Sequence, residues 1–352
     1  MLTINRRHFL GYAAALPVLG SLNSPVFGQG ATKIRTASWG GSWRDSYDKN
    51  IAQPISSKGV SVEFVLGNPD DNLAKQVAAS RQGMNAFDIM EYTPAQMNAL
   101  DGSDLFMPLD YGKLPNAENI PGWARAETAV RTQFTVDGIV YNAEKFDQLG
   151  IDPPERHEDL LDERLKGHVA FPDIANGAHW AAIVGLSGGD ETQLDPAVEM
   201  VSRMDPAYFF SGSTDLATRF GSGEIWAAPW QSGWALRLKR SGAPVAVAYP
   251  RIGEKRGALW ALSFAILEGT GAADACHVFI NQSLSPEAQY GHCAAVGQIP
   301  INAEARERMS EDPELQAMML LNEEDIANAF QIDWSKLDQD TWRERWNREV
   351  AR

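Results

Sequence analysis

The chain has 352 residues, of which 44% are hydrophobic, and it carries a formal net charge of −15 at pH 7. This length and apolar fraction predict a globular protein of about two domains with a substantial core. The negative charge argues against nucleic acid or an anionic lipid surface as a partner, because both are themselves negatively charged.

The N-terminus has the pattern of an export signal. It carries Arg6-Arg7, followed by an apolar run that ends near Leu22 and is too short to span a bilayer. This pattern is typical of the twin-arginine export route. Small or modest residues favour cleavage after Gly28, and no cysteine lies nearby to carry a lipid anchor. We therefore expect residues 1–28 to be a twin-arginine export signal and the protein to be periplasmic.

The chain that follows begins with alternating strand and helix patterns. A strand predicted at 33–38 ends at Trp39 and Gly40, and a strand predicted at 86–90 runs into Glu91 and Tyr92. This alternation predicts parallel βαβ units, whose ligands bind at the carboxyl ends of strands. We therefore mark Trp39, Gly40, Glu91 and Tyr92 as candidate ligand-binding residues. The elements expected between these two strands are a helix at 44–53 that stops at Pro54, a strand at 60–66 and a helix at 69–82.

Two long β-rich runs, at 128–142 and 258–267, are interpreted as crossings between two lobes. Strands that join two lobes suit hinge closure on a ligand. We predict lobe 1 at 29–135 plus 262–310 and lobe 2 at 136–261 plus 311–352. The other expected elements are strands at 166–171, 225–228 and 245–248, helices at 177–186, 196–204, 214–220, 234–241, 272–282 and 286–294, and a helical tail at 313–350.

Residues 224–234, with the sequence EIWAAPWQSGW, hold three of the chain's 11 tryptophans. Their spacing of four residues is also that of one helix face. Pro229 argues against a helix, because proline lacks the N–H and clashes with the preceding turn. We instead expect a turn at 229–233, which puts Trp230 at a strand end. Asp173 follows another predicted strand, where it is either a ligand-binding residue or the N-cap of the next helix.

The two cysteines, Cys276 and Cys293, form either a disulfide, which an exported protein can make, or two buried thiols. Both lie on apolar faces of predicted helices, which favours buried thiols. Neither has metal-ligand spacing with a histidine, and the sequence carries no H-E-x-x-H or comparable cluster. We therefore expect no metal ion and no cofactor.

Several features in this order resemble a known family. They are the export signal, the strand that ends in Trp39-Gly40-Gly41, the segment Gly138-Ile139-Val140-Tyr141-Asn142 and the late helix with Ser285-Pro286-Glu287-Ala288-Gln289. Together they resemble extracellular solute-binding proteins of ABC importers, and the spermidine/putrescine-binding type most of all. The resemblance implies a periplasmic-binding-protein type II fold, in which two α/β lobes clamp a small-molecule ligand. It also implies a membrane permease as partner, and we expect a monomer.

The resemblance also assigns residues to the ligand. Trp39, Trp230 and Trp260 match aromatic positions that flank the ligand in polyamine binders, and Asp173 matches an acidic position that takes an ammonium group. Aromatic faces and a carboxylate suit a cationic nitrogen, which supports the assignment on chemical grounds.

The sequence departs from the polyamine binders at three positions that are acidic in that group. They are Gly41, Asn176 and Leu262 here. Because each buried ammonium needs a carboxylate, the departure favours a solute with one cationic nitrogen over spermidine. We expect 4-aminobutyrate, another ω-amino acid or, at most, putrescine. Arg131 and Arg251 both remain candidates for binding a solute carboxylate.

Two rival functions are weighed against this interpretation. The segment 185–189 matches the G-x-S-x-G pattern of serine hydrolases, but that motif needs a strand before the serine. A helix is predicted there, so we expect a helix C-terminus and no enzyme. A ferric-ion binder usually has paired tyrosines, whereas Tyr92, Tyr208 and Tyr249 are scattered in the sequence. A solute-binding protein is therefore the preferred interpretation.

Overall fold

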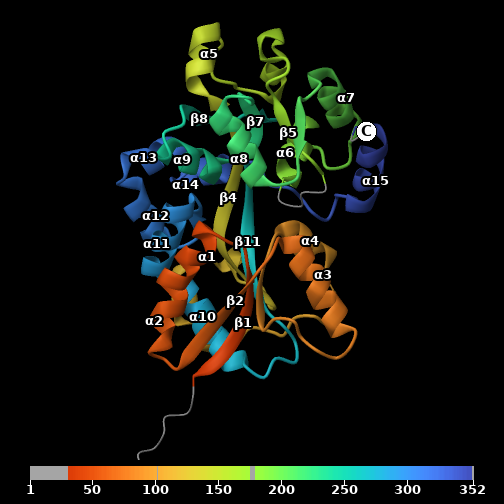
Figure 1. Ribbon diagram of the computed structural model, residues 1–352. Coiled ribbons are helices and arrows are strands. Elements are labelled where there is room, and N and C mark those ends of the chain that lie inside the picture. The colour runs from red at the N-terminus through yellow and green to blue at the C-terminus, as the bar shows by residue number, and fades with distance from the viewer. Residues whose placement is uncertain (1–30, 101, 175–178, 351–352) are drawn as a thin grey trace, which may run out of the picture. The chain divides into compact units, whose positions relative to one another are not determined.

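The computed structural model describes residues 31–100, 102–174 and 179–350. The predicted export signal at 1–28 and Asn176 lie outside the described residues. The main sheet has the strand order β12-β4-β11-β3-β1-β2, and β7 and β8 also pair with β4 (Figure 1). Its strands are β1 Thr32–Ser38, β2 Val60–Leu66, β3 Ile89–Tyr92, β4 Ala129–Asn142, β7 Ala227–Gln231, β8 Val245–Ala248, β11 Ala258–Ile266 and β12 Ile299–Pro300.

The first part of the chain forms the parallel units that the sequence predicts. Strand β1 pairs in parallel with β2 and β3. Helix α3 (Pro69–Ser80) joins β2 to β3, and its N-cap Asn68 accepts a hydrogen bond from the backbone N–H of Asp71. The helix α4 (Pro94–Ala99) follows β3 and begins with a capping box at Thr93. The carboxyl ends of β1 and β3 therefore lie beside the first turns of helices.

The predicted helix stop at Pro54 is wrong. The chain passes from α1 (Ser42–Tyr47) through a π-helical turn (Asp48–Ala52) into α2 (Gln53–Ser56), which contains the proline. Proline is tolerated at the start of a helical segment because its missing N–H is not needed there. The wider π-helical turn lets the chain resume an α-helix without a break.

Two long strands lie where the sequence predicts them, β4 in the run at 128–142 and β11 in the run at 258–267. Strand β4 pairs antiparallel with β11 up to Asp137, and from Asp137 onward it pairs with β7 and β8. Figure 1 shows β4 and β11 running from the group around β1 and β2 to the group around β7. Gly138 packs so close to β8 that a Cβ would lie 2.6 Å from the carbonyl oxygen of Ala248. Only glycine fits at this position.

The second part has a smaller sheet and several helices. Strand β5 (Ala170–Pro172), shorter than predicted, pairs in parallel with β6 (Tyr208–Phe210). Strands β9 (Arg251–Ile252) and β10 (Lys255–Arg256) form an antiparallel hairpin. The helices here are α5 Ala143–Leu149, α6 Trp180–Leu186, α7 Asp195–Met204, α8 Ser213–Ser222 and α9 Ser232–Arg240.

The turn predicted at 229–233 is also wrong, because β7 continues through Pro229 and Trp230 to Gln231. Pro229 lies opposite Ile139 in the ladder with β4. The other edge of β7 pairs with Val169 at Ala227, away from the proline. The missing N–H of Pro229 therefore costs no ladder hydrogen bond on that edge.

The C-terminal region is helical but not one continuous tail. Side chains of Asp312, Asn322 and Asp338 each accept a hydrogen bond from a backbone N–H and start a new helix. No helix among the described residues is long and apolar enough to cross a membrane. The helices of this region are α10 Ala273–Ser283, α11 Pro286–Val296, α12 Ala303–Ser310, α13 Pro313–Met318, α14 Glu323–Asn328 and α15 Gln339–Glu349.

Candidate functional site

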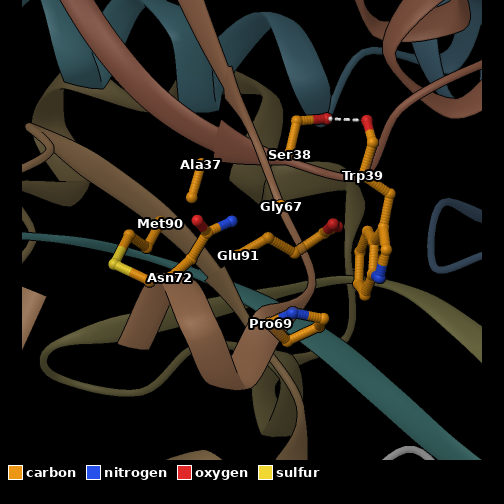
Figure 2. Close-up of a pocket in the computed structure, with 8 residues that line it drawn as sticks. All are labelled: Ala37, Ser38, Trp39, Gly67, Pro69, Asn72, Met90 and Glu91. Carbon is orange, nitrogen blue, oxygen red and sulfur yellow. Dashed lines mark hydrogen bonds between the residues drawn. The ribbon is translucent and has the colours of Figure 1, made fainter. Parts of the chain in front are cut away.

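A small pocket lies at the carboxyl ends of β1 and β3, and it brings together two of the predicted site residues, Trp39 and Glu91. Figure 2 shows the Glu91 carboxyl group extending toward the side of the pocket where the Trp39 indole lies. The pocket volume is about 10 Å³, which is the size of one water molecule. A solute can therefore enter only if the pocket opens. Its lining residues are Ala37, Ser38, Trp39, Gly67, Pro69, Asn72, Met90 and Glu91.

Glu91 is a buried carboxyl group with neutral hydrogen-bond donors around it. The Tyr47 hydroxyl donates to its Oε1, and the Gln133 amide donates to the same oxygen at 3.3 Å. Burial raises the pKa of Glu91 to about 8, because the charged form loses its hydration. The carboxyl group is therefore mostly neutral at pH 7, and a cation in the pocket would favour its ionised form.

Aromatic contacts hold Trp39 in place. Its ring meets Trp43 edge to face, with 4.8 Å between ring centroids, and Trp43 meets His292 in the same way at 4.9 Å. Gly40 and Gly41 follow Trp39 in the sequence. A Cβ on Gly40 would make only an ordinary contact with Leu66, at 3.7 Å, whereas Gly41 has φ 62° and needs glycine. The backbone therefore requires glycine at position 41 but not at position 40.

Tyr92 points away from this pocket, because successive residues of a strand face opposite sides of the sheet. Its side chain is fully buried, its ring lies 4.9 Å from that of Phe106, and its hydroxyl donates to the Met90 sulfur at 3.2 Å. The structure thus does not bring Tyr92 and Glu91 to the same pocket.

A row of buried polar side chains on β4 was missed by the sequence analysis. Gln133, Thr135 and Asp137, here called the polar row, alternate along the strand and share one face. Gln133 bonds Glu91 at one end of the row, and Asp137 accepts a hydrogen bond from the Trp260 indole N–H at 3.3 Å at the other. The signal was visible as polar residues at every second position of the long β-rich run predicted at 128–142.

Asp137 also faces a histidine. The Nδ1 atom of His179 lies 3.5 Å from Oδ1 of Asp137, and both side chains are fully buried. That carboxyl oxygen and both His179 ring nitrogens have no hydrogen-bond partner among the described residues. Buried polar groups are usually paired. These three atoms can therefore still form hydrogen bonds, and they lie beside Trp260, where β4 changes its strand partners.

Trp230 and Asp173, the predicted site residues of the second part, lie outside the Trp39–Glu91 pocket. Trp230 is fully buried, its indole N–H donates to Ser213 Oγ at 3.1 Å, and it stacks on Trp234 with 5.3 Å between centroids. Asp173 is half-buried directly after β5, and its backbone N–H donates to the Phe210 carbonyl. Among the described residues, α6 begins at Trp180 with His179 at its N-cap, and residues 175–178 lie outside the described residues, so both alternatives for Asp173 stay predictions.

The two arginines considered for a solute carboxylate are both exposed and lie outside the Trp39–Glu91 pocket. Arg131 donates to the Trp123 carbonyl at 2.7 Å and lies over the Trp123 ring. Arg251 lies in the short strand β9. Sequence reasoning missed Arg237, whose guanidinium lies 3.8 Å from the Trp234 ring centroid and whose pKa burial lowers to about 10.

The G-x-S-x-G segment, which suggested a serine hydrolase, lies at the end of a helix. Helix α6 ends at Leu186, and Ser187 is its C-cap, so the predicted helix C-terminus at the G-x-S-x-G segment is confirmed. Among the described residues there is no group of three or more histidine, cysteine, aspartate or glutamate side chains that could hold a metal ion. Cys276 and Cys293 are both buried free thiols, as the helix patterns favoured.

Comparison with known proteins identifies the family. The model of the bacterial extracellular solute-binding proteins matches residues 51–317. The chain belongs to this family. Its members are bacterial extracellular solute-binding proteins. No curated protein matches the chain in sequence.

Solved structures show the same fold at low sequence identity. An ABC transporter substrate-binding protein from Bradyrhizobium japonicum USDA 110 is 20% identical, with a TM-score of 0.76, 91% of this chain covered and 99% of that one. A GABA receptor is 20% identical, with a TM-score of 0.72 and 90% and 97% covered. The periplasmic binding protein AgtB of A. tumefaciens R10, in complex with agropinic acid, is 18% identical, with a TM-score of 0.68 and 91% and 96% covered. The predicted periplasmic-binding-protein fold is confirmed.

Proposed function

We propose that this protein is the periplasmic solute-binding component of an ABC importer and that it binds a small amine-bearing solute. The solute class is an ω-amino acid, such as 4-aminobutyrate, or a short polyamine, such as putrescine. A membrane permease of the importer receives the solute, and the binding protein acts as a monomer. The likeness to a GABA receptor supports the solute class.

The observation that carries this proposal is the pairing of Glu91 and Trp39 in one pocket. A carboxylate and an aromatic ring are the groups that recognise an ammonium ion. Tyr47 and Gln133 hold the Glu91 carboxyl from one side, and Trp43 supports the Trp39 ring. A solute ammonium would bind the ionised form of Glu91, so binding would release a proton from that residue.

All the residues that line this pocket belong to 29–135, and the pocket holds only about 10 Å³, so a solute enters it only when these side chains also shift. We propose that two lobes, 29–135 plus 262–310 and 136–261 plus 311–352, open and close around the solute. Strands β4 and β11 would be the hinge, because β4 pairs with β12 and with β7, while β11 pairs with β3 and forms a bridge to Phe330 at Ala258. Hinge motions of this kind usually occur at a few residues that absorb the change in backbone angles.

The export proposal is tested separately from binding. Residues 1–28 carry Arg6-Arg7 before the apolar run, which supports the twin-arginine route. Replacing both arginines with lysine is expected to leave the precursor in the cytoplasm, as measured by cell fractionation. Normal periplasmic amounts of this variant in cells that lack the other export routes would contradict the proposal.

A thermal-shift screen tests the function, with titration calorimetry on any compound that stabilises the protein. The compounds are 4-aminobutyrate, putrescine, spermidine and, for the rival function, ferric citrate. A solute at 100 times its dissociation constant is expected to stabilise the fold by about 2.7 kcal/mol. Stabilisation by 4-aminobutyrate or putrescine supports the proposal. Stabilisation by ferric citrate alone would contradict it.

A further inference from the structure

A second and much larger pocket is lined by residues of the helices α15, α3 and α4, whose positions Figure 1 shows. Its volume is about 410 Å³, which is within the range of sites that bind small molecules. On one side it is lined by Gln339, Arg343 and Asn347. These three side chains recur every fourth residue, so they share one face of α15.

The pocket has opposite charges on its two sides. Asp70, in the first turn of α3, accepts a hydrogen bond from the Gln96 amide at 2.9 Å. The Arg343 guanidinium lies over the Trp180 ring, 5.3 Å from its centroid. Within the described part of the chain, neither Asp70 nor Arg343 forms an ion pair. Both charges therefore remain free to bind charged groups of a solute.

Gln339 supplies an independent sign of a binding function. Its side chain is only 9% exposed, and its amide nitrogen donates to the Ala95 carbonyl at 3.4 Å. Its buried oxygen Oε1 has no hydrogen-bond partner among the described residues. A buried amide oxygen normally accepts a hydrogen bond, and this one is closed to solvent, so a solute ammonium group reaches it only when the Gln339 side chain turns toward the pocket.

Apolar residues complete the lining and set the size of the solute. Leu73 of α3 and Ile174, which follows β5, both border the pocket. A short aliphatic chain can lie against them while its charged ends reach the polar walls. This combination of a carboxylate, a guanidinium and an apolar surface is complementary to a small zwitterion.

We propose that this pocket is a second solute site, which binds a small zwitterionic amino acid. Asp70 and the Gln339 amide oxygen bind the ammonium end, and Arg343 binds the carboxylate, with the Asn347 amide beside it. The proposal rests on the charges and burial of these residues and not on the Trp39–Glu91 pocket.

Titration calorimetry with 4-aminobutyrate tests the second site, using Glu91→Gln as the starting protein so that the first pocket is weakened. Arg343→Gln in this protein is expected to raise the dissociation constant by about tenfold or more, because the solute carboxylate loses its charged partner. Asp70→Asn is expected to act in the same direction. Arg348→Gln is the matched control, since Arg348 lies on the same helix outside the pocket and pairs with Glu344 and Glu349.

Comparison compounds separate the two ends of the solute. Butyrate lacks the ammonium group and putrescine lacks the carboxylate, so Arg343→Gln should affect 4-aminobutyrate and butyrate but not putrescine. Thermal unfolding without solute shows whether each variant is folded, and Arg343→Lys, which keeps the charge, should restore part of the binding. If Arg343→Gln and Arg348→Gln bind 4-aminobutyrate equally, or if 4-aminobutyrate does not bind, the second site is ruled out. If Glu91→Gln binds 4-aminobutyrate as tightly as the parent protein, and Arg343→Gln then weakens that binding, the first pocket is wrong and the second site stands.

Discussion

Glu91 and Asp137 are two buried carboxyl groups at opposite ends of the polar row, and their surroundings differ. Glu91 lies at the end of β3, borders a pocket and accepts hydrogen bonds from Tyr47 and Gln133. Asp137 lies within the crossing strand β4 and is enclosed by His179 and Trp260. A carboxyl group at a strand end can meet a solute, whereas one within a crossing strand contacts elements of the protein itself. We therefore expect Glu91 to govern solute binding and Asp137 to govern stability.

Removal of Asp137 is expected to have the largest effect. Asp137→Ala removes the acceptor of the Trp260 indole N–H and the carboxyl group that lies 3.5 Å from His179 Nδ1 in a buried region. The expected loss is about 3–5 kcal/mol of the free energy of unfolding, measured by urea denaturation. Asp137→Asn is the control, because it keeps an acceptor for Trp260 and should lose less. If Asp137→Ala unfolds at the same urea concentration as the parent, Asp137 does not stabilise the fold and the prediction is wrong.

Replacement of Glu91 should instead weaken solute binding. Glu91→Gln is close in shape and keeps an oxygen that accepts a hydrogen bond from Tyr47, so the fold should be retained. Loss of the charge should weaken putrescine binding by about 2–5 kcal/mol, measured by titration calorimetry. Glu63→Gln is the matched control, because Glu63 pairs with Lys33 on the surface, away from the pocket. Equal putrescine affinity in the two variants would remove Glu91 from the site.

The pKa of Glu91 gives a pH test of binding. With a pKa of about 8, the residue must lose a proton before it can pair with a cation. Between pH 6.5 and 8 the affinity for putrescine should therefore rise, by at most about tenfold, or about 1.4 kcal/mol, per pH unit. Calorimetry in buffers with different ionisation enthalpies would detect the released proton. Glu91→Gln should show neither the rise in affinity nor the proton release.

The same pKa predicts the opposite trend for stability without solute. The raised pKa means that the stabilisation from neutral Glu91 is complete below its ordinary value of 4.5 and is lost as pH rises toward 8. His157 and His292 have pKa values that burial lowers to about 4 and about 3, so their effect is a loss of stability on acidification below pH 6.5. Between pH 6.5 and 8 the change in the free energy of unfolding with pH should therefore come from Glu91. Glu91→Gln should remove this pH dependence.

Trp39 should contribute the smallest of these effects. Trp39→Leu removes the aromatic face from the pocket and is expected to weaken putrescine binding by about 0.5–2 kcal/mol. Trp39→Phe keeps an aromatic ring and should lose less. Trp123→Leu is the control, because Trp123 is 52% exposed and lies outside the pocket. If Trp39→Leu and Trp123→Leu bind putrescine equally, the aromatic part of the proposed site is wrong.

Much of the fold could be predicted from the sequence. The alternation of strands and helices from β1 to β3 and the two long crossing strands follow from local hydrophobic periods, which depend on nearby residues. The errors at Pro54 and Pro229 have a common cause. A proline disrupts structure only where its missing N–H is needed, and neighbouring turns and strand partners decide that need.

The candidate site was predicted only in part. Trp39 and Glu91 were identified because each follows a strand, and strand ends in a parallel sheet meet at one edge. The Asp137–His179 contact could not be predicted, because the two residues come from β4 and from the start of α6. The pocket at Arg343 also depends on the distant helix α15 lying near α3 and α4.

The sequence by itself determined the solute-binding family, the order of strands and helices and the residues at the strand ends, because these follow from local patterns and short motifs. The tertiary structure alone decided which of those residues share a pocket. Trp39 and Glu91 face one another across two strands, Tyr92 turns to the other side of β3, and Trp230 is enclosed by Phe220 and Trp234. Side-chain direction, burial and the pKa of Glu91 depend on groups far away in the chain, which only the packed structure brings together.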